Sequence, residues 1–248
     1  RPFVELNPYR EVLSKANEFV GYLPNAETVE PDTKLGLDDM FELVRKADED
    51  YRTLQEKKEK LKQKIEEYRA KQQIVAPFRP LECDLHRVLH YRYITYRFGR
   101  IAVEFYHKMQ KYLMDDLKAI FVEGERDESY VYGVYFVSQA ETQKVDAVFR
   151  SLHFERIELK DEFEGTPDTA YRVLENEIAR VNLEIEDLDK QAGEMLADRA
   201  PQLVAARDRL EELSNNFDVR KLAARMEDKQ EDYYILCGWM AEDDVDKF

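Results

Sequence analysis

One short stretch of the chain carries side chains that could bind a metal ion. Cys83, Asp84, His86 and His90 lie close together, and histidines four positions apart share one face of a helix. The stretch follows Pro80, however, and no second group of cysteines or histidines completes a set of four ligands. We therefore interpret these residues as surface or interface packing, and we expect no metal and no cofactor.

A group of carboxylates around residues 161–168 could serve acid–base chemistry. It comprises Asp161, Glu162, Glu164 and Asp168. Such chemistry also needs a concave site in which the two groups have separated pKa values. The sequence offers no nucleophile–histidine–acid set and no phosphate-binding glycine loop. We interpret the carboxylates as a solvated turn and helix start, we predict no catalytic residue, and we expect that the chain is not an enzyme.

Two features could suggest nucleic acid as a partner. The basic run 57–71 is interleaved with glutamates, and the tyrosine-rich segment 130–135 could stack bases on a sheet. The formal net charge of the 248-residue chain is −15, which opposes binding to a phosphate backbone or to anionic lipid. We expect no nucleic-acid partner and favour basic protein surfaces.

Composition favours long, solvent-exposed helices with a modest core. Charged residues make up 37% of the chain, whereas glycine and proline number eight each, and the mean hydropathy is −0.66. Cys83 and Cys237 form no disulfide framework, which fits a reducing compartment. No apolar run is long enough for a membrane helix. The chain begins at Arg1 without a methionine, so we expect it to be a fragment.

Two long stretches have the spacing of coiled-coil helices. Residues 37–76 contain no proline or glycine, and apolar residues recur at steps of three and four, with Lys58 in one such position. A second stretch follows Gly165-Thr166-Pro167 and skips eleven residues between Ala192 and Leu203. Because Pro201 lies in that gap, we expect a bend or break there.

Charge predicts that the two stretches pair with each other, and because the intervening lobe lies at one end, the chain must return in antiparallel orientation. Residues 52–71 hold eight basic and four acidic residues, and residues 168–213 hold twelve acidic and six basic ones. Opposite flanking charges favour pairing. The antiparallel arrangement predicts that Tyr68 lies near Leu174 and Met40 near Leu203. A short helix that begins at Asn7-Pro8 should meet the region of residues 210–222.

Between the long stretches the pattern changes to a βαββαβ order. We predict strands at 91–98, 118–122, 130–137 and 155–159, and helices at 99–114 and 142–152. This order is that of a ferredoxin-like lobe, whose sheet packs one face on two helices and leaves the other for a partner. The terminal segment 233–240, with Trp239, reads as a strand whose natural partner is Phe3–Leu6 or residues outside the chain.

The predicted fold class is therefore α+β, a long antiparallel coiled-coil rod with an inserted ferredoxin-like lobe and a partial second α/β lobe at the end where the termini meet. The expected segments are the start of that second lobe with a short helix (1–35), the first coiled-coil helix (36–78), the inserted lobe (79–163), the second coiled-coil helix (164–228), and the remainder of the incomplete second lobe (229–248).

Several strings resemble one family when they are read in order. They are Tyr96-Arg97-Phe98-Gly99-Arg100, Tyr130-Val131-Tyr132-Gly133-Val134-Tyr135-Phe136, Ser151-Leu152-His153-Phe154-Glu155-Arg156-Ile157, Gly165-Thr166-Pro167 and Cys237-Gly238-Trp239-Met240-Ala241-Glu242. Together they resemble the soluble N-terminal half of V-type (A/V-type) ATPase subunit I, also called subunit a, over residues 36–248.

This resemblance implies a stator scaffold on the cytoplasmic face of a membrane. Such a scaffold links peripheral stalks to the ion-translocating membrane sector during ATP-coupled proton or sodium transport. The implied partners are the peripheral-stalk subunits and the central-shaft cap subunit. The ion-handling residues and the membrane helices belong to a C-terminal half that this chain lacks.

For partner contacts we predict the exposed surface around Arg97, Arg100, Tyr106, Glu123 and Arg126. An alternative function is a coiled-coil tether of a chromosome- or membrane-organising system, in which the ferredoxin-like lobe mediates self-association. A third alternative, an enzyme of acylphosphatase type, would need a phosphate loop and an Arg–Asn pair, and no match is convincing.

Overall fold

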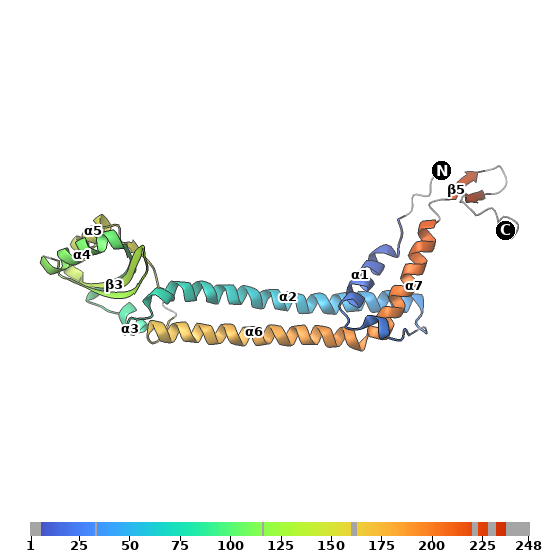
Figure 1. The fold of residues 1–248 in the computed structure, drawn as a ribbon, viewed down its shortest axis with the longest axis horizontal. Coiled ribbons are helices and arrows are strands. Elements are labelled where there is room, and N and C mark those ends of the chain that lie inside the picture. The colour runs from blue at the N-terminus through green and yellow to red at the C-terminus, as the bar shows by residue number, and fades with distance from the viewer. Residues whose placement is uncertain are drawn as a thin grey trace. The chain divides into compact units, whose positions relative to one another are not determined.

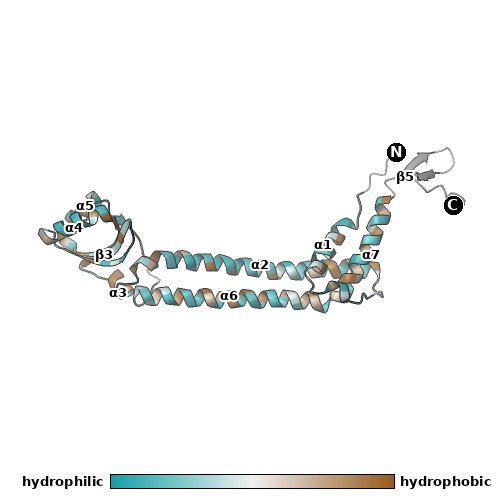
Figure 2. Ribbon diagram, viewed as in Figure 1, coloured by the Kyte–Doolittle hydropathy of each residue, from teal (hydrophilic) through white to brown (hydrophobic). Residues whose placement is uncertain are grey.

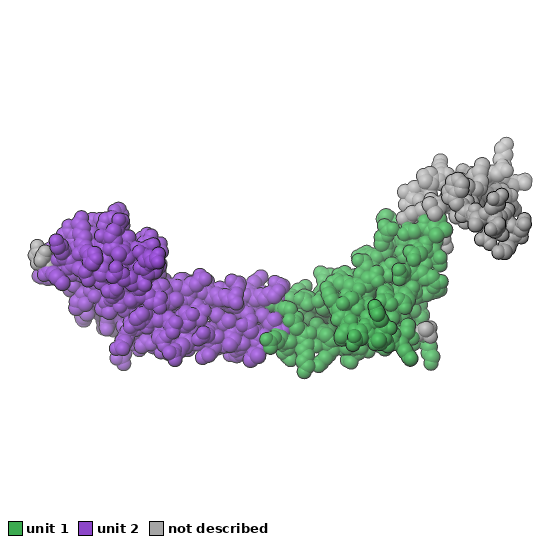
Figure 3. All heavy atoms as spheres, in the orientation of Figure 1, with its two compact units in different colours: residues 1–58, 186–248 green, residues 59–185 purple. Residues whose placement is uncertain are grey.

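The structure is a computed structural model that describes residues 6–32, 34–115, 117–159, 163–219, 223–227 and 232–236. The described residues form an α+β fold. Two compact units are present, one of residues 1–58 and 186–248 (unit 1) and one of residues 59–185 (unit 2) (Figure 3). Unit 1 is therefore built from two separate parts of the chain, whereas unit 2 is continuous.

The elements follow one another as helices, then strands and helices, then two helices and a final pair of strands (Figure 1). In chain order they are α1 (Arg10–Gly21), η1 (Ala26–Thr28), α2 (Leu37–Val75), η2 (Ala76–Phe78), α3 (Leu85–Leu89), β1 (Ile94–Ala102), α4 (Val103–Asp115), β2 (Ala119–Arg126), β3 (Tyr130–Ser138), η3 (Gln139–Glu141), α5 (Thr142–Ser151), β4 (Glu155–Arg156), α6 (Pro167–Asp198), α7 (Ala200–Val219), β5 (Ala223–Glu227) and β6 (Asp232–Leu236).

Helix α2 is 39 residues long and mostly hydrophilic (Figure 2). Asp38 and Asp39 occupy its first turn, where negative charge interacts favourably with the helix dipole. The helix ends at Val75, two residues before Pro77, whose ring and missing N–H do not continue an α-helix. The predicted uninterrupted helix is thus present.

The core of unit 1 is formed by α1, the first part of α2, the end of α6 and α7. Met40 and Leu203 lie in the same buried cluster, as the antiparallel pairing predicts. The cluster comprises Ala16, Phe19, Val20, Leu23, Met40, Val44, Ala47, Leu196, Ala200, Leu203, Val204, Ala206 and Leu210.

Helix α1 begins later than the sequence predicts. Asn7 was expected to cap the helix, but the helical residues start at Arg10. The Asn7 side chain instead accepts a hydrogen bond from the Tyr9 N–H at 3.0 Å and donates to the carbonyl oxygen of Ser214, also at 3.0 Å. Asn7 therefore ties the start of α1 to α7, which is the predicted neighbour of the short helix.

Two charged pairs join α2 to the opposing chain segment within unit 1. Lys58 Nζ donates to both carboxylate oxygens of Asp189, at 2.5 and 2.7 Å. Arg199 Nη2 donates to Asp50 Oδ2 at 2.7 Å. The lower-numbered residue of α2, Asp50, pairs with the higher-numbered partner, Arg199, and Lys58 pairs with Asp189. The two segments are therefore antiparallel in this unit.

The predicted break near Pro201 is confirmed. Helix α6 ends at Asp198 and α7 begins at Ala200, and the two run in different directions (Figure 1). Pro201 lies in the first turn of α7. Backbone N–H groups there have no acceptor within the helix, so the N–H that proline lacks costs no helical hydrogen bond. Its carbonyl oxygen accepts a hydrogen bond from the Asp32 N–H at 3.0 Å.

The end of the chain differs from the prediction. The second long helix was expected to continue to residue 228, but α7 ends at Val219 and residues 223–227 form β5. Strand β6 pairs with β5 in antiparallel orientation, so the expectation that its partner is Phe3–Leu6 or lies outside the chain is wrong. Residues 237–248, with Trp239, and residues 3–5 of the expected partner strand lie outside the described residues.

In unit 2 the strands form a four-stranded antiparallel sheet in the order β2-β3-β1-β4. Helices α4 and α5 cover one face. The buried cluster on that face is formed by Ile101, Tyr106, Met109, Leu117, Val131, Tyr135, Val137, Val145, Phe149, Leu152 and Phe154. Successive residues of a strand point to opposite faces, so the odd-numbered residues of β1 and β3 face these helices.

The limits of β1, α4, β2 and β4 differ from the prediction. Strand β2, expected at 118–122, continues to Arg126. Gly99 to Ala102 were expected to begin a helix, but they continue β1. A Cβ atom at Gly99 would lie 2.2 Å from the Glu155 carbonyl oxygen, so only glycine lets β4 approach this closely. Strand β4 itself is limited to Glu155–Arg156, shorter than the predicted 155–159.

The second face of the sheet is covered, contrary to the expectation that it stays open for a partner. The end of α2, η2, α3 and the start of α6 pack on it. The buried residues there are Val75, Phe78, Leu81, Leu85, Val88, Phe98, Val134, Phe163, Ala170 and Leu174. Tyr68 packs against this cluster, which contains Leu174, as the antiparallel pairing predicts.

Candidate partner-binding surfaces

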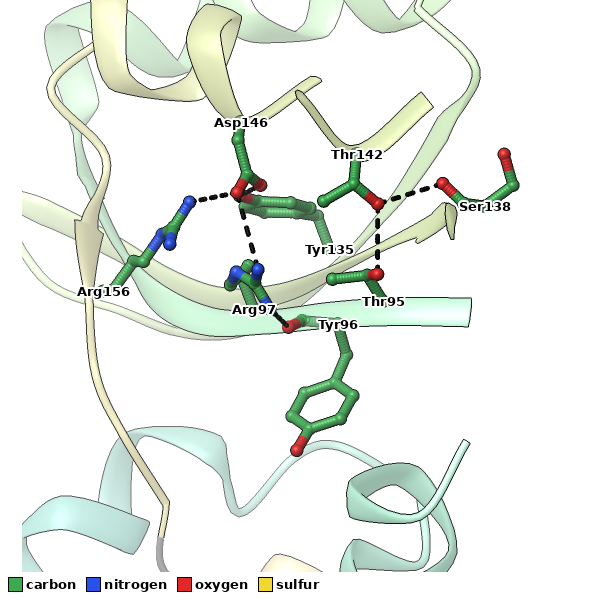
Figure 4. Close-up of polar contacts among 8 residues, drawn as sticks. All are labelled: Thr95, Tyr96, Arg97, Tyr135, Ser138, Thr142, Asp146 and Arg156. Atoms are coloured by element: carbon green, nitrogen blue, oxygen red, sulfur yellow. Dashed lines mark hydrogen bonds and ion pairs between the residues drawn. The ribbon is translucent and has the colours of Figure 1, made fainter. Parts of the chain in front are cut away.

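The most connected polar group of unit 2 surrounds Asp146 of α5 (Figure 4). The hydroxyl of Tyr135 on β3 donates to Asp146 Oδ1 at 2.7 Å. Arg156 of β4 donates to Oδ2 at 2.5 Å, and Arg97 of β1 donates to the same oxygen at 3.5 Å. One carboxylate thus connects three strands to the helix that covers them.

Burial and charge shift the titration of this group. Burial by itself opposes ionisation of Asp146, but the hydrogen bonds from Tyr135 and Arg156 and the charge of the two arginines outweigh it, so its pKa is lowered. Burial first, and then the hydrogen bond to Asp146, raise the pKa of Tyr135. Asp146 is therefore charged at neutral pH, and Tyr135 is a neutral donor.

Arg97, a predicted contact residue, belongs to this internal group. Its side chain is 31% exposed, and its Nη1 donates to the Tyr96 carbonyl oxygen at 2.9 Å. Its Nε is buried and makes no hydrogen bond to any described residue. Most of its donors are therefore oriented by the lobe rather than toward solvent.

Arg100 lies on the opposite face of the sheet. It stacks over the Tyr130 ring at 4.1 Å and pairs with Glu155 at 2.6 Å. The guanidinium group therefore holds β1, β3 and the short strand β4 together at one corner of the lobe.

Tyr106, Glu123 and Arg126 come together on a third part of the lobe. The Tyr106 hydroxyl of α4 donates to Glu123 Oε2 of β2 at 2.6 Å, and Arg126 lies 5.8 Å from the Tyr106 ring centre. Burial first, and then the Glu123 hydrogen bond, raise the pKa of Tyr106 to about 12. Glu123 and Arg126 are exposed, but Tyr106 is only 6% exposed, so its placement on the exposed surface was wrong.

The five predicted contact residues thus do not form one surface. Glu123 and Arg126 share an exposed edge of the lobe, while Arg97 and Arg100 point to opposite faces of the sheet. A partner that contacts the first two cannot contact all five on one flat patch.

Sequence reasoning missed an exposed apolar strip on the same lobe. Ile120 of β2 is 67% exposed, and Val122 is 40% exposed. Tyr93, just before β1, and Ile94, the first residue of β1, are exposed as well. The alternation of exposed Ile120 and Val122 with partly buried Phe121 is typical of an edge strand, and β2 lies at one side of the sheet.

Of the candidate metal ligands, the two histidines lie close together. Cys83 is half-buried, and burial raises the pKa of its thiol. The rings of His86 and His90 lie 4.3 Å apart. In the part of the chain that the structure describes, no group of three or more metal-ligating side chains is present.

One residue of the predicted acidic turn, Asp168, forms an ion pair within unit 2. Asp168, in the first turn of α6, pairs with Arg79 at 2.8 Å, and Arg79 stacks on Tyr171 at 4.2 Å. Hydrogen bonding to Arg79 lowers the pKa of Asp168. Glu164 lies just before this helix, while Asp161 and Glu162 lie outside the described residues.

The comparisons with known proteins found no match by sequence, and the structural likeness is weak. No protein-family model matches the chain, and no curated protein matches it. Among the described helices, none is long and apolar enough to cross a membrane. The chain is similar to the crystal structure of the cytoplasmic N-terminal domain of subunit I, homolog of subunit a, of V-ATPase, with a TM-score of 0.46, 12% identity, and coverage of 86% of this chain and 71% of that one. Values this low establish neither a common fold nor a common function.

Proposed function

We propose that the chain is a non-catalytic stator scaffold of a rotary V/A-type ATPase. In this role it links the peripheral stalks to the ion-translocating membrane sector, on the cytoplasmic face of the membrane, during proton or sodium transport. The supporting observation is the presence of two long charged helices, α2 of 39 and α6 of 32 residues. Helices of this length exceed what a globular core requires.

The proposed mechanism is mechanical. Helices α2 and α6 form an antiparallel coiled coil, which carries load along its axis, and the βαββαβ lobe is a ferredoxin-like attachment module. The steps of three and four along the seam support this assignment, as do the Lys58–Asp189 and Asp50–Arg199 pairs. Contacts that are individually weak hold firmly when several are made at once.

We propose that the lobe contacts a stalk through the edge that carries Glu123 and Arg126. These two are the exposed members of the predicted contact set. The apolar strip of Ile120 and Val122 lies on the same strand and adds surface that favours burial. Arg97 and Arg100 would then act by supporting the sheet beneath the contact.

Titration with the purified peripheral-stalk heterodimer of the same organism tests the function. We expect a defined complex of micromolar affinity or better in calorimetry and in size-exclusion chromatography with light scattering, weakened by salt. The charge swap Glu123→Lys with Arg126→Glu should weaken it about tenfold or more. The matched swap Lys144→Glu with Glu158→Lys, at exposed positions of the same lobe, should leave it unchanged.

A self-associating tether is the second candidate, because an edge strand with Ile120 two-thirds exposed can pair with a second copy. The same light-scattering experiment separates the two. A monomer that captures the stalk heterodimer supports the stator. A dimer that Ile120→Lys converts to a monomer, together with no stalk binding, contradicts the stator and supports the tether.

A further inference from the structure

A groove of about 390 Å³ lies between α1 and α2 in unit 1. Its lining includes the apolar side chains of Val12, Phe41 and Val44. Val44 is buried, whereas Val12 and Phe41 are partly exposed. The volume suits a few aliphatic side chains.

The charges that line this groove do not balance. Glu11, Asp38, Glu42 and Asp48 are acidic, and Lys15 and Arg45 are basic. Four carboxylates therefore face two cations, and the groove has a negative excess.

Both cations of the groove are already engaged within the chain. Lys15 Nζ lies 3.0 Å from Glu18 and 3.3 Å from Asp48. Arg45 lies 2.6 Å from Glu42 and 3.7 Å from Glu49.

The remaining two carboxylates are available to a ligand. Glu11 and Asp38 are exposed, and neither forms an ion pair with any described residue. They stand on different helices, Glu11 on α1 and Asp38 on α2, so one cationic ligand in the groove can meet both walls.

The walls of the groove restrict the shape of an occupant. Both are α-helices, whose backbone N–H and C=O groups bond within the helix and offer no edge to an extended strand. An amphipathic helix needs only an apolar floor and side-chain contacts at the rim. The net charge of the chain, −15, also disfavours an anionic occupant.

We propose that this groove, the α1–α2 groove, binds a basic amphipathic helix of a partner protein. Aliphatic side chains of that helix insert against Val12 and Phe41, and its lysine or arginine side chains pair with Glu11 and Asp38. The proposal stands independently of the stator function, because it uses only the shape and charge of unit 1.

Fluorescence anisotropy with designed helical peptides tests the groove. The probe is an 18-residue peptide with leucines on one face and lysines elsewhere, and its control carries glutamates in place of the lysines. The intact chain should bind the lysine peptide and not the glutamate peptide. Glu11→Gln with Asp38→Asn should weaken binding about tenfold, because rim charges contribute modestly one at a time.

A matched variant separates groove binding from general attraction to an acidic protein. Glu186→Gln with Glu211→Gln removes the same number of charges from exposed positions outside the groove lining. It should change the affinity less than twofold. A third variant, Val12→Ser, leaves the charges intact and should weaken binding several-fold through the lost apolar contact.

Equal weakening by the two double variants, or no effect of Val12→Ser, would overturn the proposal. The outcome is distinguishable from that of the stalk titration. Loss of stalk binding with groove-dependent peptide binding would reject only the stator. Stalk binding together with groove-independent peptide binding would reject only the groove.

Discussion

The sheet lobe of unit 2 and the helix pair of unit 1 are stabilised in different ways. In the lobe, Tyr135 and Phe149 stack with ring centres 3.9 Å apart, and both are buried. In the stretch of α2 from Tyr51 to Lys58, the inward-facing residues are only partly buried, and Lys58 occupies one of the seam positions. The lobe relies on dense aromatic packing, whereas this part of the helix pair relies on few apolar contacts and on charge.

This difference separates stability from specificity. Buried aromatic rings contribute large free energies whatever their exact partners. A charged pair at a seam position contributes little net stability but penalises every register that leaves it unpaired. We therefore expect substitutions in the lobe to change how firmly it folds, and substitutions at the Lys58–Asp189 pair to change how uniquely the helices align.

The largest effect is expected for Phe149→Ala. Phe149 is 1% exposed and contacts Tyr135, Phe121 and Phe154. Its removal leaves a cavity that should cost about 3–5 kcal/mol in the free energy of unfolding. Urea unfolding followed by near-ultraviolet circular dichroism measures this. The control Tyr93→Ala, at a side chain 80% exposed, should cost less than about 0.5 kcal/mol.

The Asp146 group should give the next largest effect. Asp146→Asn leaves Arg97 and Arg156 without their counter-charge, and we expect a loss of about 2–3 kcal/mol at pH 7. Because the pKa of Asp146 is lowered in the folded state, its contribution is present above the unfolded pKa and disappears as pH falls through the folded value. Unfolding from pH 7 to pH 2 should thus bring wild type and variant together. A gap that stays constant with pH would contradict this assignment, and Asp187→Asn, at an exposed position, serves as the control.

A smaller effect is expected for Tyr106→Phe, which removes the hydrogen bond to Glu123. The loss should be about 1 kcal/mol at pH 7. The pKa of Tyr106 is raised to about 12, so its contribution is complete below the unfolded value near 10 and is lost as pH rises through the folded one. The difference between wild type and variant should therefore shrink above pH 10. Tyr112→Phe, at an exposed tyrosine, should show no such difference at either pH.

The smallest effect on stability is expected at Lys58 and Asp189. A double-mutant cycle with alanine at both positions should give a coupling energy of about 0.5–1 kcal/mol that decreases with salt. The reversed pair Lys58→Asp with Asp189→Lys should restore most of it. Spin labels on Leu54 and Glu194 would report a broader distance distribution in the single variants. An unchanged distribution would show that the pair does not set the register.

The sequence predicts those parts of the fold that depend on local pattern. The spacing of Tyr171, Leu174 and Ile178 identifies α6, Pro201 marks the break, and the alternation of residues 130–137 identifies β3. These signals are local because each concerns one element and its immediate neighbours.

Features that depend on distant contacts were not predictable. The cover on the second face of the sheet comes from η2, α3 and the start of α6, which no pattern in β1 or β3 reveals. Asp146 is a single acid on an amphipathic helix, and its partner Arg97 lies 49 positions away. The sequence around Tyr106 suggests an exposed tyrosine, because nothing in it indicates that Phe121 of β2 packs against the ring.

The division of unit 1 into two chain segments has a consequence for synthesis of the protein. The ribosome completes residues 59–185 before any residue of α7 exists. Unit 2 can therefore fold during translation. The apolar face of α1 and α2, which includes Phe19 and Val44, stays exposed until Leu203 and Leu210 have been synthesised. We expect this exposed apolar face to be the part of the nascent chain that molecular chaperones bind.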